Sequence, residues 1–282
     1  MTEPILLCCD LDRTVLPNGP QPESPQARPL LRAVAARPEL TLAYVSGRHL
    51  ELLLEAIREY RIPAPDFAIG DVGTTIYDVR GGDWRPWEAW SEEIAPDWAG
   101  MSREELARLF SDLAPLRPQE PEKQNTFKLS YYADEDADHQ ALLAQMGERL
   151  QRRGVRASLI WSVDEVARVG LLDVLPERAT KVHAIRFMIE RDGFDEARTV
   201  FAGDSGNDLP VLTSGLQAVL VRNAREEVRR AALERLRAGG DPERLYLARG
   251  GFHGMNGNYS AGVLEGLAHF LPESEAWMDT EA

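Results

Sequence analysis

Short apolar runs alternate with stretches of helical spacing at both ends of this 282-residue chain, and that alternation constrains the fold more than any other feature. Pro4–Cys9 is an uninterrupted apolar run of strand length, which is typical of a strand buried on both faces of a parallel sheet. Leu40–Val45 and Phe67–Ile69 are further runs of this kind, whereas Pro25–Arg37 and Leu50–Tyr60 have helical spacing. This alternation predicts an α/β fold built on a doubly wound, Rossmann-like parallel sheet.

The same alternation returns near the end of the chain. Strands are expected at Thr199–Ala202 and Leu216–Val221, and helices at Ala179–Glu190, Asp208–Thr213, Ala224–Arg237 and Asn258–Phe270, the last with Asn258 as its N-cap. Residues 1–83 and 173–282 are therefore expected to form one core domain.

The middle of the chain differs and predicts an inserted α+β domain over residues 84–172. Four of the six tryptophans lie within residues 81–100, among glycine, proline and acidic residues. Ser102 and Glu105 form the pattern of a capping box at the start of a helix. The other expected elements are strands at Thr126–Tyr132, Val155–Trp161 and Ala167–Leu172 and a long amphipathic helix at Asp136–Arg153.

Composition excludes several classes of partner. The chain holds 46 acidic residues against 32 Lys and Arg, a net charge of −14, so the phosphates of nucleic acids and of anionic lipids would repel it. No apolar run approaches the roughly 18 residues that span a bilayer, and no basic region precedes an apolar stretch at the N-terminus. The only cysteines, Cys8 and Cys9, are adjacent and cannot staple a fold. We expect a cytoplasmic protein with no nucleic-acid or membrane partner.

Two acidic residues, Asp10 and Asp12, follow the first predicted strand. In open α/β sheets ligands bind outside the carboxyl ends of the strands, so both side chains can reach one crevice. Two such close carboxylates repel, and one is expected to be protonated unless a cation lies there. The alternative is an aspartate-rich turn that caps the next helix.

A glycine-rich acidic loop, Gly203–Asp208, follows the predicted strand Thr199–Ala202. Asp204 and Asp208 offer the hard oxygen ligands that suit Mg²⁺. The alternative is a turn in which Asn207 or Asp208 caps a helix.

Two further positions favour anion binding. Ser46 and Gly47 lie at a strand-to-helix turn, where a hydroxyl and backbone N–H groups can bind an anion, although Ser46 is also a suitable helix cap. Lys181 is one of only three lysines in a chain that otherwise uses arginine, and a compact ammonium suits a crowded phosphate pocket. Chance retention of Lys181 on the surface is the alternative.

These motifs, in this order, resemble those of the haloacid dehalogenase superfamily of phosphatases. Its Asp-x-Asp-x-Thr motif stands here at Asp10–Thr14, and its later motifs at Ser46, Lys181 and Gly203–Asp208. That superfamily carries a large α/β cap domain as an insertion between the serine and the lysine. A closer similarity to sucrose-phosphate phosphatases rests on Gly47-Arg48, Asp71–Thr74, Gln124–Ser130 and Asn256–Gly262.

The resemblance implies hydrolysis of a phosphomonoester in two steps. Asp10 would attack phosphorus and form an aspartyl phosphate, and Asp12 would protonate the leaving oxygen and then activate water. Asp12 is accordingly expected to be protonated for part of the cycle.

The resemblance also implies a set of binding residues. The phosphoryl group would be bound by Ser46, Gly47, Lys181 and Asn207, and Mg²⁺ by Asp10, the main-chain carbonyl of Asp12, Asp204 and Asp208. Sugar hydroxyls would be contacted by Arg48, Gln124, Asn125 and Lys128. The tryptophans of residues 84–98 either stack on sugar or pack in the protein. None of the five histidines has the spacing of a metal-ligand pair.

Sucrose-6-phosphate is the expected substrate, with mannosylfructose phosphate, glucosylglycerol phosphate or a hexose phosphate as alternatives. A phosphomutase, a signalling receiver and a non-catalytic sugar-phosphate-binding module attached to a glycosyltransferase are the competing functions. We expect a monomer that associates with a sugar-phosphate synthase.

Overall fold

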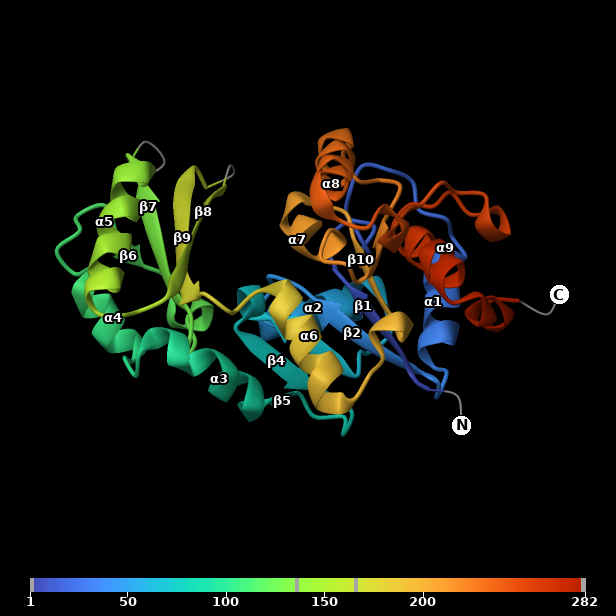
Figure 1. Ribbon diagram of the computed structural model, residues 1–282, viewed down its shortest axis with the longest axis horizontal. Helices are drawn as coiled ribbons and strands as arrows, with labels where there is room; N and C mark the ends of the chain where they lie inside the picture. The colour runs from blue at the N-terminus through green and yellow to red at the C-terminus, as the bar shows by residue number, and fades with distance from the viewer. Residues whose placement is uncertain (1–2, 135–136, 165–166, 280–282) are drawn as a thin grey trace. The chain divides into compact units, whose positions relative to one another are not determined.

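The chain divides into two units, seen in a computed structural model that describes residues 3–134, 137–164 and 167–279 (Figure 1). The first unit contains the chain up to Pro86 and from Lys181 onward, and the second contains Trp87–Thr180. The sequence predicts the second boundary at 172/173, eight residues early. The difference arises because β9 (Val169–Pro176) pairs within the second unit's sheet and contributes nothing to the core sheet.

The first unit is built on an eight-stranded sheet with the order β12-β11-β10-β1-β2-β3-β4-β5. The strands are β1 (Ile5–Cys9), β2 (Leu40–Val45), β3 (Phe67–Gly70), β4 (Thr75–Asp78), β5 (Arg85–Pro86), β10 (Thr199–Gly203), β11 (Gln217–Leu220) and β12 (Leu245–Leu247). Pairing is parallel from β12 to β3, and β4 and β5 are antiparallel. The predicted doubly wound parallel sheet is confirmed, and its strand order reverses between β1 and β10.

Helices flank this sheet (Figure 1). They are α1 (Ala27–Ala35), α2 (Leu50–Tyr60), α6 (Lys181–Asp192), α7 (Leu209–Leu212), α8 (Glu226–Gly239) and α9 (Ser260–Phe270). Helix α9 is buried over most of its length and lies against β11, where a Cβ at Gly266 would overlap the Val219 side chain. The expected N-cap at Asn258 is wrong, because its amide donates to Pro22 O and the residue before the helix is Tyr259.

The second unit has a four-stranded antiparallel sheet with the order β6-β7-β9-β8, as the α+β prediction requires. Its elements besides β9 are α3 (Glu88–Ile94), α4 (Arg103–Leu109), β6 (Arg117–Pro118), β7 (Leu129–Asp134), α5 (His139–Arg152) and β8 (Ala157–Asp164). The capping box of Ser102 and Glu105 is present. Asp136, the expected start of the long helix, lies outside the described residues, and the side chain of Asp138 caps α5.

Trp90 and Trp98 are fully buried, which supports packing over sugar stacking for these two rings. Trp98 packs edge-on against Phe127 inside the second unit. Trp84 instead packs against Tyr77 in the first unit.

The predictions about location are tested only in part. Cys8 and Cys9 are free and buried in β1. Among the helices that the structure describes, none combines the length and the apolar character that crossing a membrane requires. A cytoplasmic location stays a prediction.

Candidate active site

Three neighbouring strands of the first unit end at the same edge of the sheet and carry the predicted site residues there. Asp10 follows β1, Ser46 follows β2, and Asp204 follows β10. The backbone N–H of Asp10 donates to Ala202 O at 2.9 Å, and that of Ser46 donates to Ile69 O at 2.8 Å. These bonds extend the parallel pairing past the strand ends, so the positions of both residues are fixed by the sheet.

Lys181, the first residue of α6, joins two carboxylates that are far apart in the sequence. Its Nζ lies 2.8 Å from Asp10 Oδ1 and 2.7 Å from Asp208 Oδ1, and both acids are buried. Burial acts to lower the pKa of Lys181, but the two carboxylates outweigh it and raise that pKa above its ordinary value. The side chain is therefore a partly buried ammonium within this cluster, and the surface alternative is wrong.

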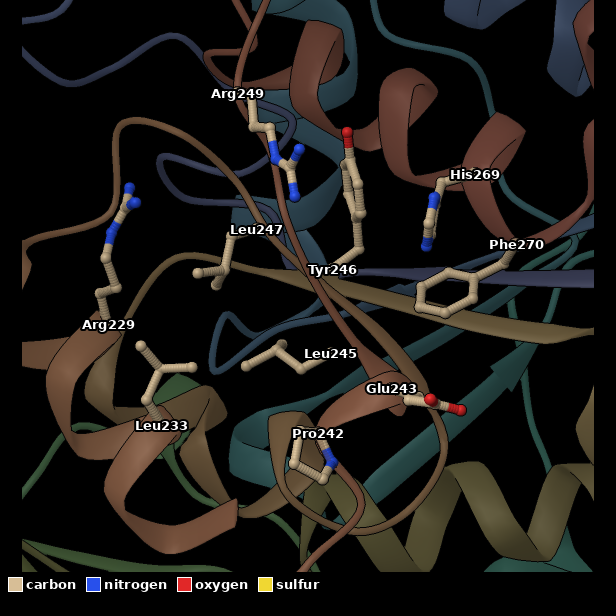
Figure 2. A pocket seen from close by; sticks show the side chains of 10 residues that line it. All are labelled: Arg229, Leu233, Pro242, Glu243, Leu245, Tyr246, Leu247, Arg249, His269 and Phe270. Carbon is tan, nitrogen blue, oxygen red and sulfur yellow. The ribbon is translucent and has the colours of Figure 1, made fainter. Parts of the chain in front are cut away.

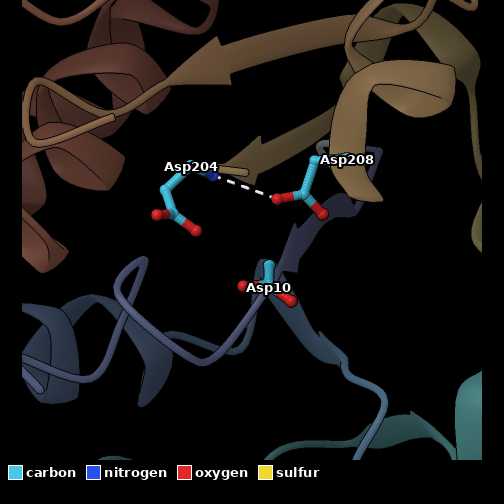
Figure 3. Close-up of side chains that lie close together, drawn as sticks. All are labelled: Asp10, Asp204 and Asp208. Atoms are coloured by element: carbon cyan, nitrogen blue, oxygen red, sulfur yellow. Dashed lines mark hydrogen bonds between the residues drawn. The ribbon is translucent and has the colours of Figure 1, made fainter. Parts of the chain in front are cut away.

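Asp10, Asp204 and Asp208 converge in space (Figure 3). One carboxylate oxygen from each lies within 4.8 Å of the other two. Burial and the charge of Asp208 raise the pKa of Asp10 to about 7, although Lys181 opposes this shift, and they raise the pKa of Asp204 to about 6. Lys181 and Arg13, whose Nε lies 3.3 Å from Asp204 Oδ2, together do not balance three buried acids, so the donor set fits a divalent cation such as Mg²⁺.

Asp208 also holds the loop in which it lies. Its Oδ2 accepts hydrogen bonds from Asp204 N at 3.1 Å, Ser205 N at 3.0 Å and Ser205 Oγ at 3.0 Å. Gly203 is required here, because a Cβ at this position would lie 2.6 Å from Asp208 Cγ. The capping alternative is wrong, because Ser205 is the N-cap of this turn and the Asp208 side chain makes no capping bond to α7. Asp208 Oδ2 instead holds the loop, while its Oδ1 contacts Lys181.

Asp12 differs from the expectation that it is held protonated. Arg48 binds it through two bonds, Nε to Oδ2 at 2.8 Å and Nη2 to Oδ1 at 2.6 Å, and Asn18 donates to Oδ1 at 2.7 Å. Although partial burial acts to raise it, these bonds hold the pKa of Asp12 below its ordinary value. Asp12 is ionised in this structure because a guanidinium faces it.

The residues predicted to bind phosphate, apart from Lys181, follow the carboxyl ends of β2 and β10. Ser46 is buried and its Oγ accepts from Arg48 N at 3.2 Å, and it is not the N-cap of α2, a position that His49 occupies. Gly47 and Asn207 are exposed on the loops after β2 and β10. Their binding of phosphate stays a prediction.

The predicted sugar-binding residues of the second unit lie together in the turn before β7. Gln124 has its amide committed to the backbone: Nε2 donates to Gln119 O and Ser130 O, and Oε1 accepts from Ser130 N. Asn125 Oδ1 accepts from Phe127 N, and Lys128 is 8% exposed. Gln124 therefore holds the turn, which leaves Lys128 as the side chain with a charge to offer.

Sequence reasoning missed two residues that support the acidic cluster. Arg13, with a φ of 60°, places its Nε 3.3 Å from Asp204 Oδ2. Asn223 follows β11, donates to Arg13 O and accepts from Tyr259 N. Asn223 follows a strand next to β10, so the rule about carboxyl ends could have found it.

Residues 3–271 match the family model described as sucrose-6F-phosphate phosphohydrolase. A putative HAD-like hydrolase of Nitrosococcus oceani is 64% identical over 283 residues, which cover 99% of this chain and 75% of that protein. The mannosylfructose-phosphate phosphatase of Agrobacterium fabrum is 27% identical over 268 residues, covering 94% of this chain and 96% of that protein. The X-ray structure of the Synechocystis sucrose-phosphatase with sucrose and phosphate superposes with a TM-score of 0.69 at 27% identity, covering 95% of this chain and 98% of the other.

Mg²⁺ should raise the melting temperature of the wild-type protein, because a cation offsets the repulsion among Asp10, Asp204 and Asp208. A concentration of about 100 times Kd corresponds to about 2.7 kcal/mol of stabilisation, which differential scanning calorimetry resolves. Asp204→Asn should lose most of this gain. Asp66→Asn, a control that changes a half-buried carboxylate bonded to Leu42 N, should keep it. An undiminished gain in Asp204→Asn would remove Asp204 from the metal site.

Proposed function

The chain belongs to the sucrose-6F-phosphate phosphohydrolase family and is a phosphoric monoester hydrolase of the haloacid dehalogenase type, and on that premise we propose that it hydrolyses sucrose-6-phosphate with the help of Mg²⁺. The observation that carries the proposal is the convergence of Asp10, Lys181, Asp204 and Asp208 at one edge of the sheet. The carboxylate of Asp10 can act as the nucleophile, and the ammonium of Lys181 and the two further carboxylates lie beside it. Phosphoryl transfer needs such an arrangement of charges around the reacting group.

Asp10 acts as the nucleophile. Its carboxylate oxygen attacks phosphorus, the bond from phosphorus to the sugar oxygen breaks, and the phosphoryl group is left on Asp10 as an acyl phosphate. Asp10 is suited to this role because the sheet fixes its backbone, and Lys181 and Thr14 Oγ1 hold its two oxygens. The ammonium of Lys181, 2.8 Å from Asp10 Oδ1, is proposed to offset the negative charge that develops on the transferring group.

Asp12 acts as the acid and then as the base. It gives a proton to the departing sugar oxygen and afterwards takes one from the water that releases phosphate from Asp10. Since Arg48 holds Asp12 ionised in this structure, the first step requires Arg48 to release Asp12 when substrate binds and Asp12 then to take up a proton from solvent. The proposal of Arg48 as a sugar-binding residue fits such an exchange, in which the guanidinium leaves Asp12 for the substrate.

Mg²⁺ would be held by Asp10, Asp204, Asp208 and the main-chain carbonyl of Asp12, and when bound it would supply positive charge that offsets the phosphate dianion. Ser46, Gly47 and Asn207 are proposed to donate hydrogen bonds to the phosphoryl oxygens. The guanidinium of Arg13, whose Nε lies 3.3 Å from Asp204 Oδ2, partly offsets the negative charge of Asp204.

Three observations support a sugar as the leaving group. The matched family is described by sucrose phosphate, the superposed Synechocystis enzyme was solved with sucrose and phosphate, and the Agrobacterium relative acts on mannosylfructose phosphate. The last makes mannosylfructose phosphate the first alternative substrate, ahead of glucosylglycerol phosphate and hexose phosphates. A monomer in the cytoplasm, associated with a sugar-phosphate synthase, remains part of the proposal.

A screen of phosphate release should identify the substrate. With Mg²⁺ present, sucrose-6-phosphate should have the highest kcat/KM among the four classes of sugar phosphate, and a chelator should abolish turnover. Asp10→Asn should lower kcat by roughly 10³-fold or more, because the amide is not a nucleophile. A higher kcat/KM for another sugar would correct the substrate, and activity in Asp10→Asn or after thorough metal removal would contradict the mechanism.

The same assay separates the competing functions. A phosphomutase would return the phosphoryl group to a second hydroxyl without releasing phosphate. A non-catalytic binding module would release none from any substrate, although it would lack a reason to keep both Asp10 and Asp12.

Lys128→Ala should raise KM for the sugar phosphate by about tenfold, the effect of losing one charge-assisted hydrogen bond. KM for p-nitrophenyl phosphate, which has no sugar, should stay unchanged. Lys123→Ala is the matched control, since Lys123 is already bonded to Tyr132 and lies 3.2 Å from Glu120. Equal effects of Lys128→Ala on both substrates would exclude Lys128 from sugar binding.

A further inference from the structure

A cavity of about 620 Å³ lies along β12, the outer strand of the first unit's sheet (Figure 2). All three residues of this strand, Leu245, Tyr246 and Leu247, line it. Successive side chains of a strand point to opposite faces of a sheet, so a cavity that touches three in a row follows the strand's edge. Since β11 separates β12 from β10, and none of the acidic cluster lines the cavity, it is a place apart from the candidate active site.

The backbone of β12 offers hydrogen-bonding groups to this cavity. Ala248 N donates to Leu220 O of β11 at 3.0 Å, so Ala248 and, two residues earlier, Tyr246 direct their backbone groups toward β11. Leu245 and Leu247 then direct theirs outward. In the described part of the chain, the N–H and carbonyl of Leu247 have no hydrogen bond on that outer side.

The walls of the cavity suit a flat ring. Leu233 of α8 joins Leu245 and Leu247 in an apolar surface. On the other side Tyr246 and His269 are stacked, with ring centroids 4.2 Å apart, and Phe270 lies next to them (Figure 2). Apolar and aromatic walls around a few polar groups are typical of small-molecule sites.

Two arginines add positive charge to the cavity of a chain with a net charge of −14. Arg249 donates its backbone N–H to Glu265, while its guanidinium has no hydrogen bond or ion pair within the described residues. Figure 2 shows this guanidinium beside Tyr246. Burial and a hydrogen bond to Glu265 raise the pKa of Tyr246 to about 12, and the charge of Arg249 opposes that shift.

Arg229 is the second cation, and its Nε is buried without a hydrogen bond, 3.5 Å from Glu226. Glu226 forms an ion pair with Arg229, but the other acids nearby do not neutralise Arg249. Glu265 is already committed to Tyr246 OH, Arg249 N and Gly250 N, and Glu243 is exposed at the rim. Guanidinium groups with free donors bind phosphate well.

We propose that this cavity binds an adenine nucleotide. The base lies between the leucine side chains and the aromatic wall. Its edge, which presents both donors and acceptors, pairs with the outward carbonyl of Leu245 and the outward N–H of Leu247, because the N–H of Leu245 already donates to Pro242 O. The phosphate lies at Arg249 and Arg229. One ligand of this class accounts for the free strand edge, the flat apolar space and the unpaired guanidinium of Arg249 together.

AMP binding to the full-length protein, followed by NMR of leucine methyl groups, tests the proposal at the site itself. AMP should give saturable shifts of the Leu233, Leu245 and Leu247 methyl resonances at concentrations up to about 5 mM. Arg249→Gln should raise Kd about fivefold, as expected for loss of a charge-assisted contact. Arg230→Gln, which changes an exposed arginine of α8 outside the cavity, should leave Kd unchanged.

Three results would overturn the proposal. The first is the absence of AMP-dependent shifts at these three leucines. The second is an equal response to inorganic phosphate, which would make the cavity a plain anion site. The third is evidence that the arginines take no part in binding, either as equal affinity for AMP and adenosine or as an unchanged Kd in Arg249→Gln. Because the leucines report locally, AMP bound at the acidic cluster does not mimic a positive result.

Discussion

The ion pairs of Lys181 with Asp10 and Asp208 are the interaction on which the rest of the site depends. They join Asp10 of the first motif and Asp208 of the last to Lys181, which lies 171 residues after Asp10, and no hydrogen bond from Lys181 to Asp204 is seen in the described residues. The cost of burying three carboxylates appears as the raised pKa values of Asp10 and Asp204, to about 7 and about 6. A site that binds a divalent cation gains from this arrangement, because its ligands are already gathered before the cation arrives.

The parallel sheet brings these carboxylates together. β1 and β10 are neighbours although the second unit and α6 lie between them in the sequence, and their carboxyl ends point the same way. Asp10 and the loop of Asp204 and Asp208 therefore meet without help from the second unit.

The sequence predicted the buried strands and the site well, because both have strong local signals. A run such as Ile5–Cys9 is too apolar and too short to be anything but a buried strand, and the four motifs carry their own chemistry. The strand β12 was not predicted, because three residues are too few to show a hydrophobic period. β9 has the same apolar character as a core strand, so nothing local showed to which sheet it belongs, and the domain boundary was placed too early.

Contacts between distant residues account for the other differences. The charge of Asp12 is set by Arg48, 36 residues away, and the side chain of Asn258 donates to Pro22 O rather than capping the helix that follows it. Gln124 was expected at the sugar, yet its amide is used three times by the backbone of its own turn. A motif identifies which residues matter, but only the fold shows which partners they have.

The central claim is that the Asp10 carboxylate becomes phosphorylated, and trapping the acyl phosphate tests it most directly. Enzyme quenched in acid during turnover of its best sugar phosphate, then reduced with borohydride, would be digested and analysed by mass spectrometry. The account predicts conversion of residue 10 to homoserine in the peptide that contains it, and no conversion at Asp12, Asp204 or Asp208. Reduction at one of those three instead, or none at all under turnover, would contradict it.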